Sequence, residues 1–203
     1  MKDVKKFFTA RNVAYLAILL ALVIVLQACS GFFKIGTTSL SFVLIPIVLG
    51  GMLLGVWAGA ILGFAFGLVV IIDAVCGLDP FTLILLQESP FFTVFLCLLK
   101  GTLAGVVSAL LFKLINKKNK YVAVFVATIA APIVNTGIFI LGGLCISGLI
   151  SSLFLDGSTS VIYFLVIVCA GINFIIEFSI NLVFSPALYT VDRVVEKRIQ
   201  ARG

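Results

Sequence analysis

Long apolar stretches alternate with short polar segments over almost the whole of this 203-residue chain. A transmembrane helix needs roughly 20 consecutive apolar residues to cross about 30 Å of hydrocarbon. The apolar stretch 40–77 is long enough for two helices, and the glycines that crowd its middle predict a tight turn near Gly55–Val56. The pattern therefore predicts six transmembrane helices, at about 12–33, 40–55, 57–77, 91–114, 121–146 and 161–191.

Two of the connections are longer than a tight turn. Residues 78–90 include Asp79-Pro80 and Ser89-Pro90, and they predict an irregular, partly apolar link. Residues 147–160 include Asp156-Gly157-Ser158, which is typical of a loop. Neither segment is expected to contribute a helix.

Composition decides which solvent surrounds these helices. Hydrophobic residues make up 63% of the chain and charged residues only 11%, whereas a soluble domain is typically about half apolar and about a quarter charged. So little polar surface cannot cover a water-soluble globule, and lipid must take its place. We therefore expect an all-α integral membrane protein, multi-pass in the cell membrane, in which residues 1–203 form a single six-helix domain.

The basic residues predict the orientation of the helices. Twelve of the fourteen Lys and Arg residues fall into three clusters: Lys2, Lys5, Lys6 and Arg11; Lys113, Lys117, Lys118 and Lys120; Arg193, Lys197, Arg198 and Arg202. Because basic loops stay on the cytoplasmic side, an even number of crossings must separate each cluster from the next. Six helices with both termini and the 113–120 loop in the cytoplasm meet this condition. The net charge of +6 is thus a topology signal rather than a nucleic-acid footprint.

Metal and enzyme chemistry have little support in the sequence. The chain has no His, which removes the commonest metal ligand and general base. Its five Cys lie in or beside apolar runs without C-x-x-C spacing, as small hydrophobic residues of helices do. We expect no metal, no cofactor and no enzymatic activity.

Small residues recur at helical spacing on three of the predicted helices. Gly59, Gly63 and Gly67 share one helix face, as do Gly101 and Gly105 on the fourth helix, and both rows predict close helix packing. On the first helix, Ala17 and Ala21 form a similar strip. From spacing alone, this strip fits internal packing and an outward docking face equally well.

Three charged residues fall within or near predicted spans, where charge is rare and usually functional. Asp73 is near the outer end of its helix, where it can be partly hydrated. Lys100 lies about nine residues into the fourth helix, and it could snorkel outward, pair with a carboxylate or hold an anionic substrate. Glu177 is near the middle of the sixth helix, so it needs a partner, a proton or water.

Uncharged polar residues accompany these charges. Asn173, Glu177 and Asn181 follow each other at intervals of four residues and form one polar stripe. Asn135 and Thr136 come just after Pro132, which frees a backbone carbonyl and bends the fifth helix. Interhelical hydrogen bonding could explain each residue taken alone. Polar groups on the fourth, fifth and sixth helices together favour a shared cavity open to the outside.

The ordered set of motifs resembles the S components of energy-coupling factor (ECF) transporters. The resemblance rests on six short helices in about 200 residues, on the alanine strip, on IPIVLGG at 45–51 followed by Gly55 and Ala58-Gly59, on KGTLAG at 100–105, and on N-x-x-x-E-x-x-x-N at 173–181 with Ser-Pro-Ala at 185–187. S components bind a vitamin or related micronutrient from outside the cell. They dock on one transmembrane T subunit and two cytoplasmic ATPases. ATP chemistry then belongs to the partners, and this chain has no G-x-x-x-x-G-K-[ST] loop of its own.

The resemblance also implies roles for individual residues. The helix-one motif that contacts the T subunit in the family matches Ala17 and Ala21. The positions that match the family's ligand pocket are Thr37, Thr38, Phe42, Gln87, Lys100, Asn135, Thr136 and Asn173. Glu177 and Asn181 lie deeper and are expected to support the pocket floor.

A cation and several amides suit a small polar acid, and pantothenate fits this description. The Pro-Ile-Val-Asn-Thr segment at 132–136 most resembles pantothenate-type S components. Riboflavin or folate would instead need flat aromatic walls, which the 19 Phe could supply. The alternatives from other classes are a stand-alone proton-coupled carrier with Glu177 as the relay, a membrane enzyme, and a scaffold subunit without a ligand.

Overall fold

The computed structural model describes residues 9–30, 34–35, 38–39, 42–155 and 159–200 as a bundle of helices. The long helices are α2 (Ala10–Ser30), α4 (Val56–Val75), α6 (Pro90–Ile115), α7 (Lys120–Cys145) and α10 (Ile172–Gln200). The shorter helices are α3 (Leu44–Leu54), α5 (Pro80–Glu88), α8 (Ser147–Phe154), α9 (Val161–Tyr163) and the π-helical segment η1 (Phe164–Gly171). Strands β1 (Lys34–Ile35) and β2 (Thr38–Ser39) pair antiparallel, with Lys34 opposite Ser39.

Five of the predicted membrane crossings are confirmed by length and composition. In the part of the chain that the structure describes, these spans are α2, α4, α6, α7 and the continuous segment Val161–Val195. The segment predicted at 40–55 is a shorter apolar helix, α3, which begins at Leu44 and has 11 residues. At 1.5 Å per residue it is only about 16 Å long, which is about half of the hydrocarbon thickness. A sixth crossing remains a prediction.

The prediction was wrong for the two longer connections. Residues 78–90 contain α5, and the first half of 147–160 forms α8. The chain signals α5 through Asp79, whose side chain caps the helix, and Pro80, which takes the first helical position. The predicted turn at Gly55 is confirmed: Gly55 has φ 94° and separates α3 from α4.

Glycines set the closest helix contact of the bundle, between α4 and α6. A Cβ on Gly59 would lie 2.5 Å from the carbonyl oxygen of Gly105, and one on Gly63 would collide with the carbonyl oxygen of Gly101. A Cβ on Gly67 would lie 2.6 Å from the carbonyl oxygen of Cys97. The two predicted glycine rows therefore face each other, which confirms the close packing expected from their spacing.

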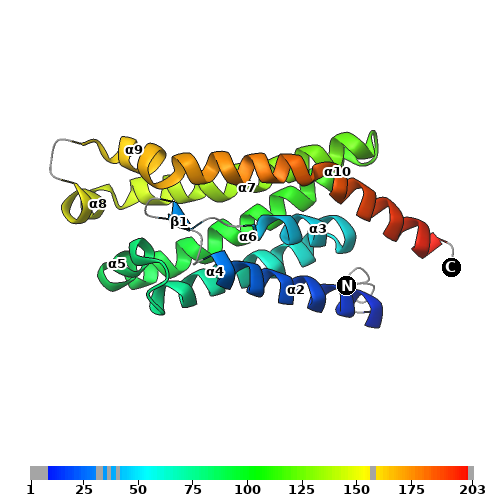
Figure 1. Ribbon diagram of the computed structural model, residues 1–203, viewed down its shortest axis with the longest axis horizontal. Helices are drawn as coiled ribbons and strands as arrows, with labels where there is room; N and C mark the ends of the chain where they lie inside the picture. Colours follow the sequence, from blue (N-terminus) through cyan, green and yellow to red (C-terminus); the bar gives the residue numbers. More distant parts are fainter. Residues whose placement is uncertain (1–8, 31–33, 36–37, 40–41, 156–158, 201–203) are drawn as a thin grey trace.

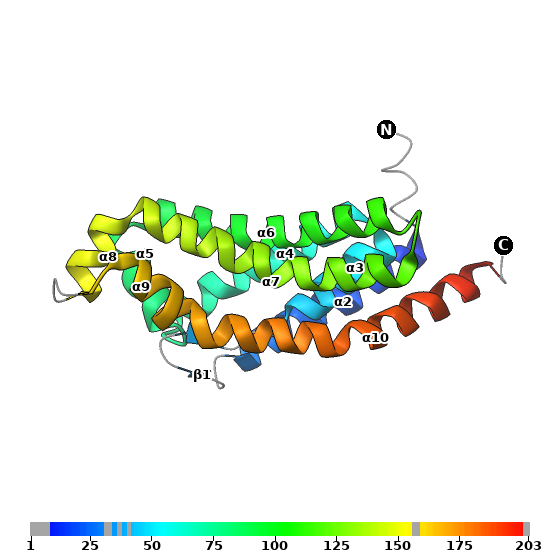
Figure 2. The same ribbon diagram turned by 90° about the horizontal axis from the view of Figure 1, so that it is seen from above.

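The two ends of the bundle differ in chemistry. The α6–α7 turn, the start of α2 and the C-terminal part of α10 lie at one end, whereas α5, α8 and α9 lie at the other (Figures 1 and 2). At the first end, Lys120 and Asp192 form an ion pair of 2.6 Å that joins α7 to α10. The predicted basic clusters thus share one end of the molecule as far as they are described.

The apolar core consists of two clusters that follow one another along the length of the bundle. A large cluster is built on α2, α3, α4, α6 and α7 and includes Phe66 and Val70. A second cluster, made by residues of α5, α8 and η1, includes Phe81 and Phe164. The cavity described next is lined by residues of both clusters.

Candidate functional site

A cavity lies where the two apolar clusters meet. It holds about 660 Å³ of space between protein atoms, part of which is open to solvent. Its lining comes from α2, α4, α5, α6, α7, η1 and α10 and consists of Gln27, Phe66, Val70, Asp79, Phe81, Thr82, Lys100, Asn135, Thr136, Phe139, Cys169, Ala170, Asn173, Phe174 and Glu177. This mixture of aromatic and polar side chains is typical of a small-molecule site.

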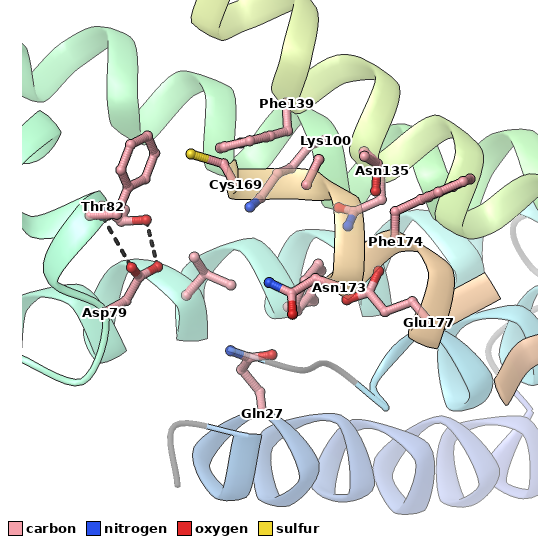
Figure 3. Close-up of a pocket in the computed structure, with 15 residues that line it drawn as sticks. Gln27, Asp79, Thr82, Lys100, Asn135, Phe139, Cys169, Asn173, Phe174 and Glu177 are labelled. Atoms are coloured by element: carbon pink, nitrogen blue, oxygen red, sulfur yellow. Dashed lines mark hydrogen bonds between the residues drawn. The ribbon is translucent and has the colours of Figure 1, made fainter. Parts of the chain in front are cut away.

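Helix α5 enters the cavity wall through its capped first turn. The Asp79 carboxylate accepts a hydrogen bond from the Thr82 backbone N–H at 3.2 Å and another from the Thr82 hydroxyl at 2.6 Å (Figure 3). The first of these bonds satisfies one of the amide groups that a helix start leaves free. The capped turn holds Phe81 and Thr82 at the cavity. Because no helix was predicted in this segment, three lining residues were missed: Asp79, Phe81 and Thr82.

Four aromatic rings pack together at the α5 and α8 end, and two of them, Phe81 and Phe139, line the cavity. The ring of Phe81 lies 5.9 Å from that of Phe139, 5.0 Å from that of Phe154 and 6.3 Å from that of Phe164, measured between centroids. The Phe81–Phe139 pair is edge-to-face, which is a favourable geometry for aromatic contacts. These four rings come from α5, α7, α8 and η1 and hold the elements together beside the cavity.

Lys100 is the cation of the cavity. Its ammonium nitrogen lies 5.6 Å from the centroid of the Phe139 ring, within the range of a cation–π contact. No carboxylate of the described residues lies within 4 Å of this nitrogen. Lys100 is half-buried on α6, and its charge is directed into the cavity rather than paired with a described carboxylate (Figure 3).

Two buried asparagines face the cavity from opposite helices. Asn135 on α7 and Asn173 on α10 are each 8% exposed. The Oδ1 atoms of both accept no hydrogen bond from any part of the chain that the structure describes. Thr136, which follows Asn135 on α7, also lines the cavity, as does Glu177, one helical turn after Asn173 on α10. Asn135, Thr136 and Asn173 were predicted as ligand contacts and Glu177 as deeper support; the structure places all four in the lining.

The π-helical segment η1 leads directly into Asn173. Cys169 and Ala170 of this segment line the cavity, and Asn173 is the second residue of the α-helix that follows. A π-helix has wider turns than an α-helix and frequently occurs at functional sites. It changes the angular position of the residues that follow, so α-helical periodicity through residues 161–173 could not predict which of them face the cavity.

Helix α2 contributes a residue that sequence analysis did not assign to the site. Gln27 lines the cavity, and its side-chain N–H donates to the carboxylate of Asp73 on α4 at 2.9 Å. Both side chains are buried. Asp73, for which partial hydration was one expectation, is therefore inside the bundle and linked to the cavity wall.

Other predicted site residues lie elsewhere. Gln87 is exposed on α5, and Phe42 is half-buried ahead of α3; neither lines the cavity. Asn181 is fully buried outside the lining, and its side-chain N–H donates to the backbone carbonyl of Glu177 at 2.8 Å. Thr37 lies outside the described residues, and Thr38 is described only through the backbone of β2.

The alanine strip of α2 faces outward. Ala17 and Ala21 are exposed, whereas Leu19 and Val23 on the other side of the helix are buried in the core. Of the two possibilities that spacing left open, the geometry fits an outward face. A face of small residues allows another helix to approach closely.

Comparison with known proteins gives one match. The family model described as "ECF transporter, substrate-specific component" matches residues 11–189. Neither the curated proteins nor the solved structures gave a match. The matched range includes every residue that lines the cavity as well as the alanine strip of α2.

Proposed function

Because the chain belongs to the family of substrate-specific components of ECF transporters, we propose that it captures pantothenate from outside the cell. The observation that carries this proposal is the cavity, which combines the ammonium group of Lys100 with the amides of Asn135 and Asn173. A cation suits the carboxylate of the vitamin, and amides suit its hydroxyl and amide groups. Apolar lining residues such as Phe66 and Val70 supply the contact that its methyl groups require.

The proposed function includes partners that this chain needs for transport. A T subunit would dock on the face that contains Ala17 and Ala21, and two cytoplasmic ATPases would supply the energy. The chain itself would bind the vitamin without turning it over. Its location would be the cell membrane, with the basic end of the bundle in the cytoplasm.

A flat vitamin such as riboflavin or folate is the second candidate, and the aromatic part of the lining supports it. Phe81, Phe139 and Phe174 all reach the cavity. Phe81 and Phe139 meet at 61°, however, so these two rings do not form the parallel walls between which a flat ring system would stack. This geometry favours the smaller, non-planar acid.

Equilibrium binding to the detergent-purified chain tests the proposal. Pantothenate, riboflavin and folate are titrated separately, and mass spectrometry identifies any small molecule that is released when the purified protein is denatured. We expect stoichiometric, saturable binding of pantothenate and no comparable binding of the two flat vitamins. Tight binding of riboflavin or folate, or release of an unrelated molecule, would refute the pantothenate assignment.

A further inference from the structure

Two buried acceptors in the wall of the cavity receive no hydrogen bond from the described residues. They are the Oδ1 atoms of Asn135 and Asn173. Asp79 contributes a carboxylate, but its oxygens accept hydrogen bonds from Thr82. A buried acceptor without a donor costs free energy, so a ligand that donates hydrogen bonds here is favoured over one that only accepts them.

The position of these acceptors relative to Lys100 determines which end of the ligand lies at which end of the cavity. The ammonium group of Lys100 lies against Phe139, whereas Asn135 is one helical turn farther along α7 from the α8 end. One turn of an α-helix is about 5.4 Å. The cation therefore lies nearer the α5 and α8 end of the cavity, and Asn135 lies nearer its centre.

Asn173 extends the acceptor region across the cavity. It projects from α10, which faces α7, and Figure 3 shows its amide in the same central space as those of Asn135 and Gln27. Asn135 and Asn173 are buried, and their Oδ1 atoms have no donor among the described residues. Water or a ligand must therefore donate the hydrogen bond that each oxygen can accept. Two such oxygens on opposite walls can receive two donors from one molecule.

We propose that the ligand lies with its acidic group at Lys100 and with a hydroxyl- or N–H-bearing end that donates to the Oδ1 atoms of Asn135 and Asn173. The two asparagines are then the residues that select a hydroxylated acid over a plain acid of the same shape and charge. This proposal rests on the proposed function, because it assigns a direction and a selectivity to binding in the same cavity.

A comparison of two ligands with matched variants tests this selectivity. The ligands are pantothenate and its analogue without the two hydroxyl groups, which has the same charge. The variants are Asn135→Leu and Asn173→Leu, which remove the acceptor, and Asn135→Asp and Asn173→Asp, which retain one. Asn116→Leu, an exposed position at the end of α6 and far from the lining, is the control. Dissociation constants are measured for every pair.

The parent protein should prefer pantothenate to the analogue by about 100-fold, because each of the two hydrogen bonds contributes about tenfold. Each Leu variant should lose about tenfold of this preference, because it removes one acceptor, weakens pantothenate binding and leaves analogue binding nearly unchanged. Each Asp variant should keep the preference even where added negative charge weakens both ligands, since both carry the same charge. The Asp variants also give a result if a Leu variant does not fold.

Two outcomes would overturn the proposal, and they differ in what they say about the site. If the parent binds pantothenate but each Leu variant weakens both ligands by the same factor, the hydroxyl groups do not meet these asparagines. The direction of binding is then wrong, while the proposed function stands. If the parent binds no pantothenate, the ligand assignment fails first and the direction fails with it.

Discussion

At the scale of single residues, the cavity places one cation beside several acceptors. Lys100 is half-buried, faces the ring of Phe139 and has no carboxylate within 4 Å among the described residues. A charge in a membrane-spanning helix is costly unless water, a counter-ion or a ligand compensates it. The carboxylates of Asp79 and Glu177 line the same cavity but lie more than 4 Å from this nitrogen. An acidic ligand would supply a closer negative charge, which gives this lysine a direct role in selectivity.

Replacement of Lys100 should therefore separate acidic from neutral ligands. Removal of one partner of a buried charge pair is expected to weaken binding by about 30-fold or more. Lys100→Ala should weaken the binding of pantothenate by this factor, whereas panthenol, the neutral alcohol of the same shape, should change by less than about threefold. Isothermal titration of both ligands on the parent and the variant measures the difference. Equal affinities of parent and variant for pantothenate would remove Lys100 from the site.

Sequence reasoning found the lining residues whose polarity conflicts with their helix, and it missed the others. Lys100, Asn135 and Asn173 interrupt long apolar runs, so each stands out in the sequence as a polar residue inside a membrane span. Gln27 lies near the end of its predicted helix, where a polar residue needs no explanation. Asp79 and Thr82 belong to a short helix, and only three-dimensional packing brings them to the cavity.

At the scale of elements, the contact between α4 and α6 holds Lys100 in position. Gly101, its neighbour in sequence, packs against Gly63 so closely that neither can carry a side chain without movement of the backbone. The rotation of α6 about its axis is thereby fixed. Lys100 projects into the cavity as a consequence of this contact.

Substitutions at two glycines test this interface. Gly63→Ala should lower the stability by about 1–3 kcal/mol, because the added methyl group collides with the carbonyl oxygen of Gly101. Gly137→Ala on α7 is the matched control, since its added methyl group would meet no neighbouring element within 4 Å in the described part of the chain. Thermal unfolding in detergent should show a lower midpoint for the first variant and an unchanged or slightly higher midpoint for the second. Equal midpoints would contradict tight packing at Gly63.

The outward face of α2 calls for a different substitution. Ala17→Trp or Ala21→Trp should abolish transport in the presence of the T subunit and ATPases, because a large ring prevents close helix approach. Ligand affinity of the isolated chain should be unchanged, since both positions are exposed and lie outside the cavity lining. Transport assays and equilibrium binding on the same preparations separate the two effects. A loss of affinity would mean that the strip serves internal packing.

The long helices were predictable and the short ones were not, for a physical reason. A span must be apolar over roughly 20 residues, so α4, α6 and α7 stand out in the sequence. The helices α5 and α8 have only nine and eight residues, and their stability depends on packing against the rest of the bundle. The π-helical segment η1 has no comparable sequence signal.

At the scale of the whole molecule, the basic end and the aromatic end predict the orientation in the membrane. Asn116 lies in the α6–α7 turn at the basic end, and Thr159 lies ahead of α9 at the opposite end; both are exposed. Single cysteines at these two positions, in a background without native cysteines, test the orientation. A membrane-impermeant thiol reagent should label Thr159→Cys in intact cells and Asn116→Cys only after the cells are opened. The reverse pattern would refute cytoplasmic termini.

The central claim is that this molecule binds its ligand but needs partners to move it. Uptake of radiolabelled pantothenate into proteoliposomes tests this claim most directly, with the chain alone and with the T subunit, the two ATPases and enclosed ATP. We predict saturable binding but no accumulation by the chain alone, including under an imposed proton gradient, and ATP-dependent accumulation by the complete assembly. Accumulation driven by the proton gradient in liposomes that contain only this chain would contradict the account and would favour a carrier that uses Glu177.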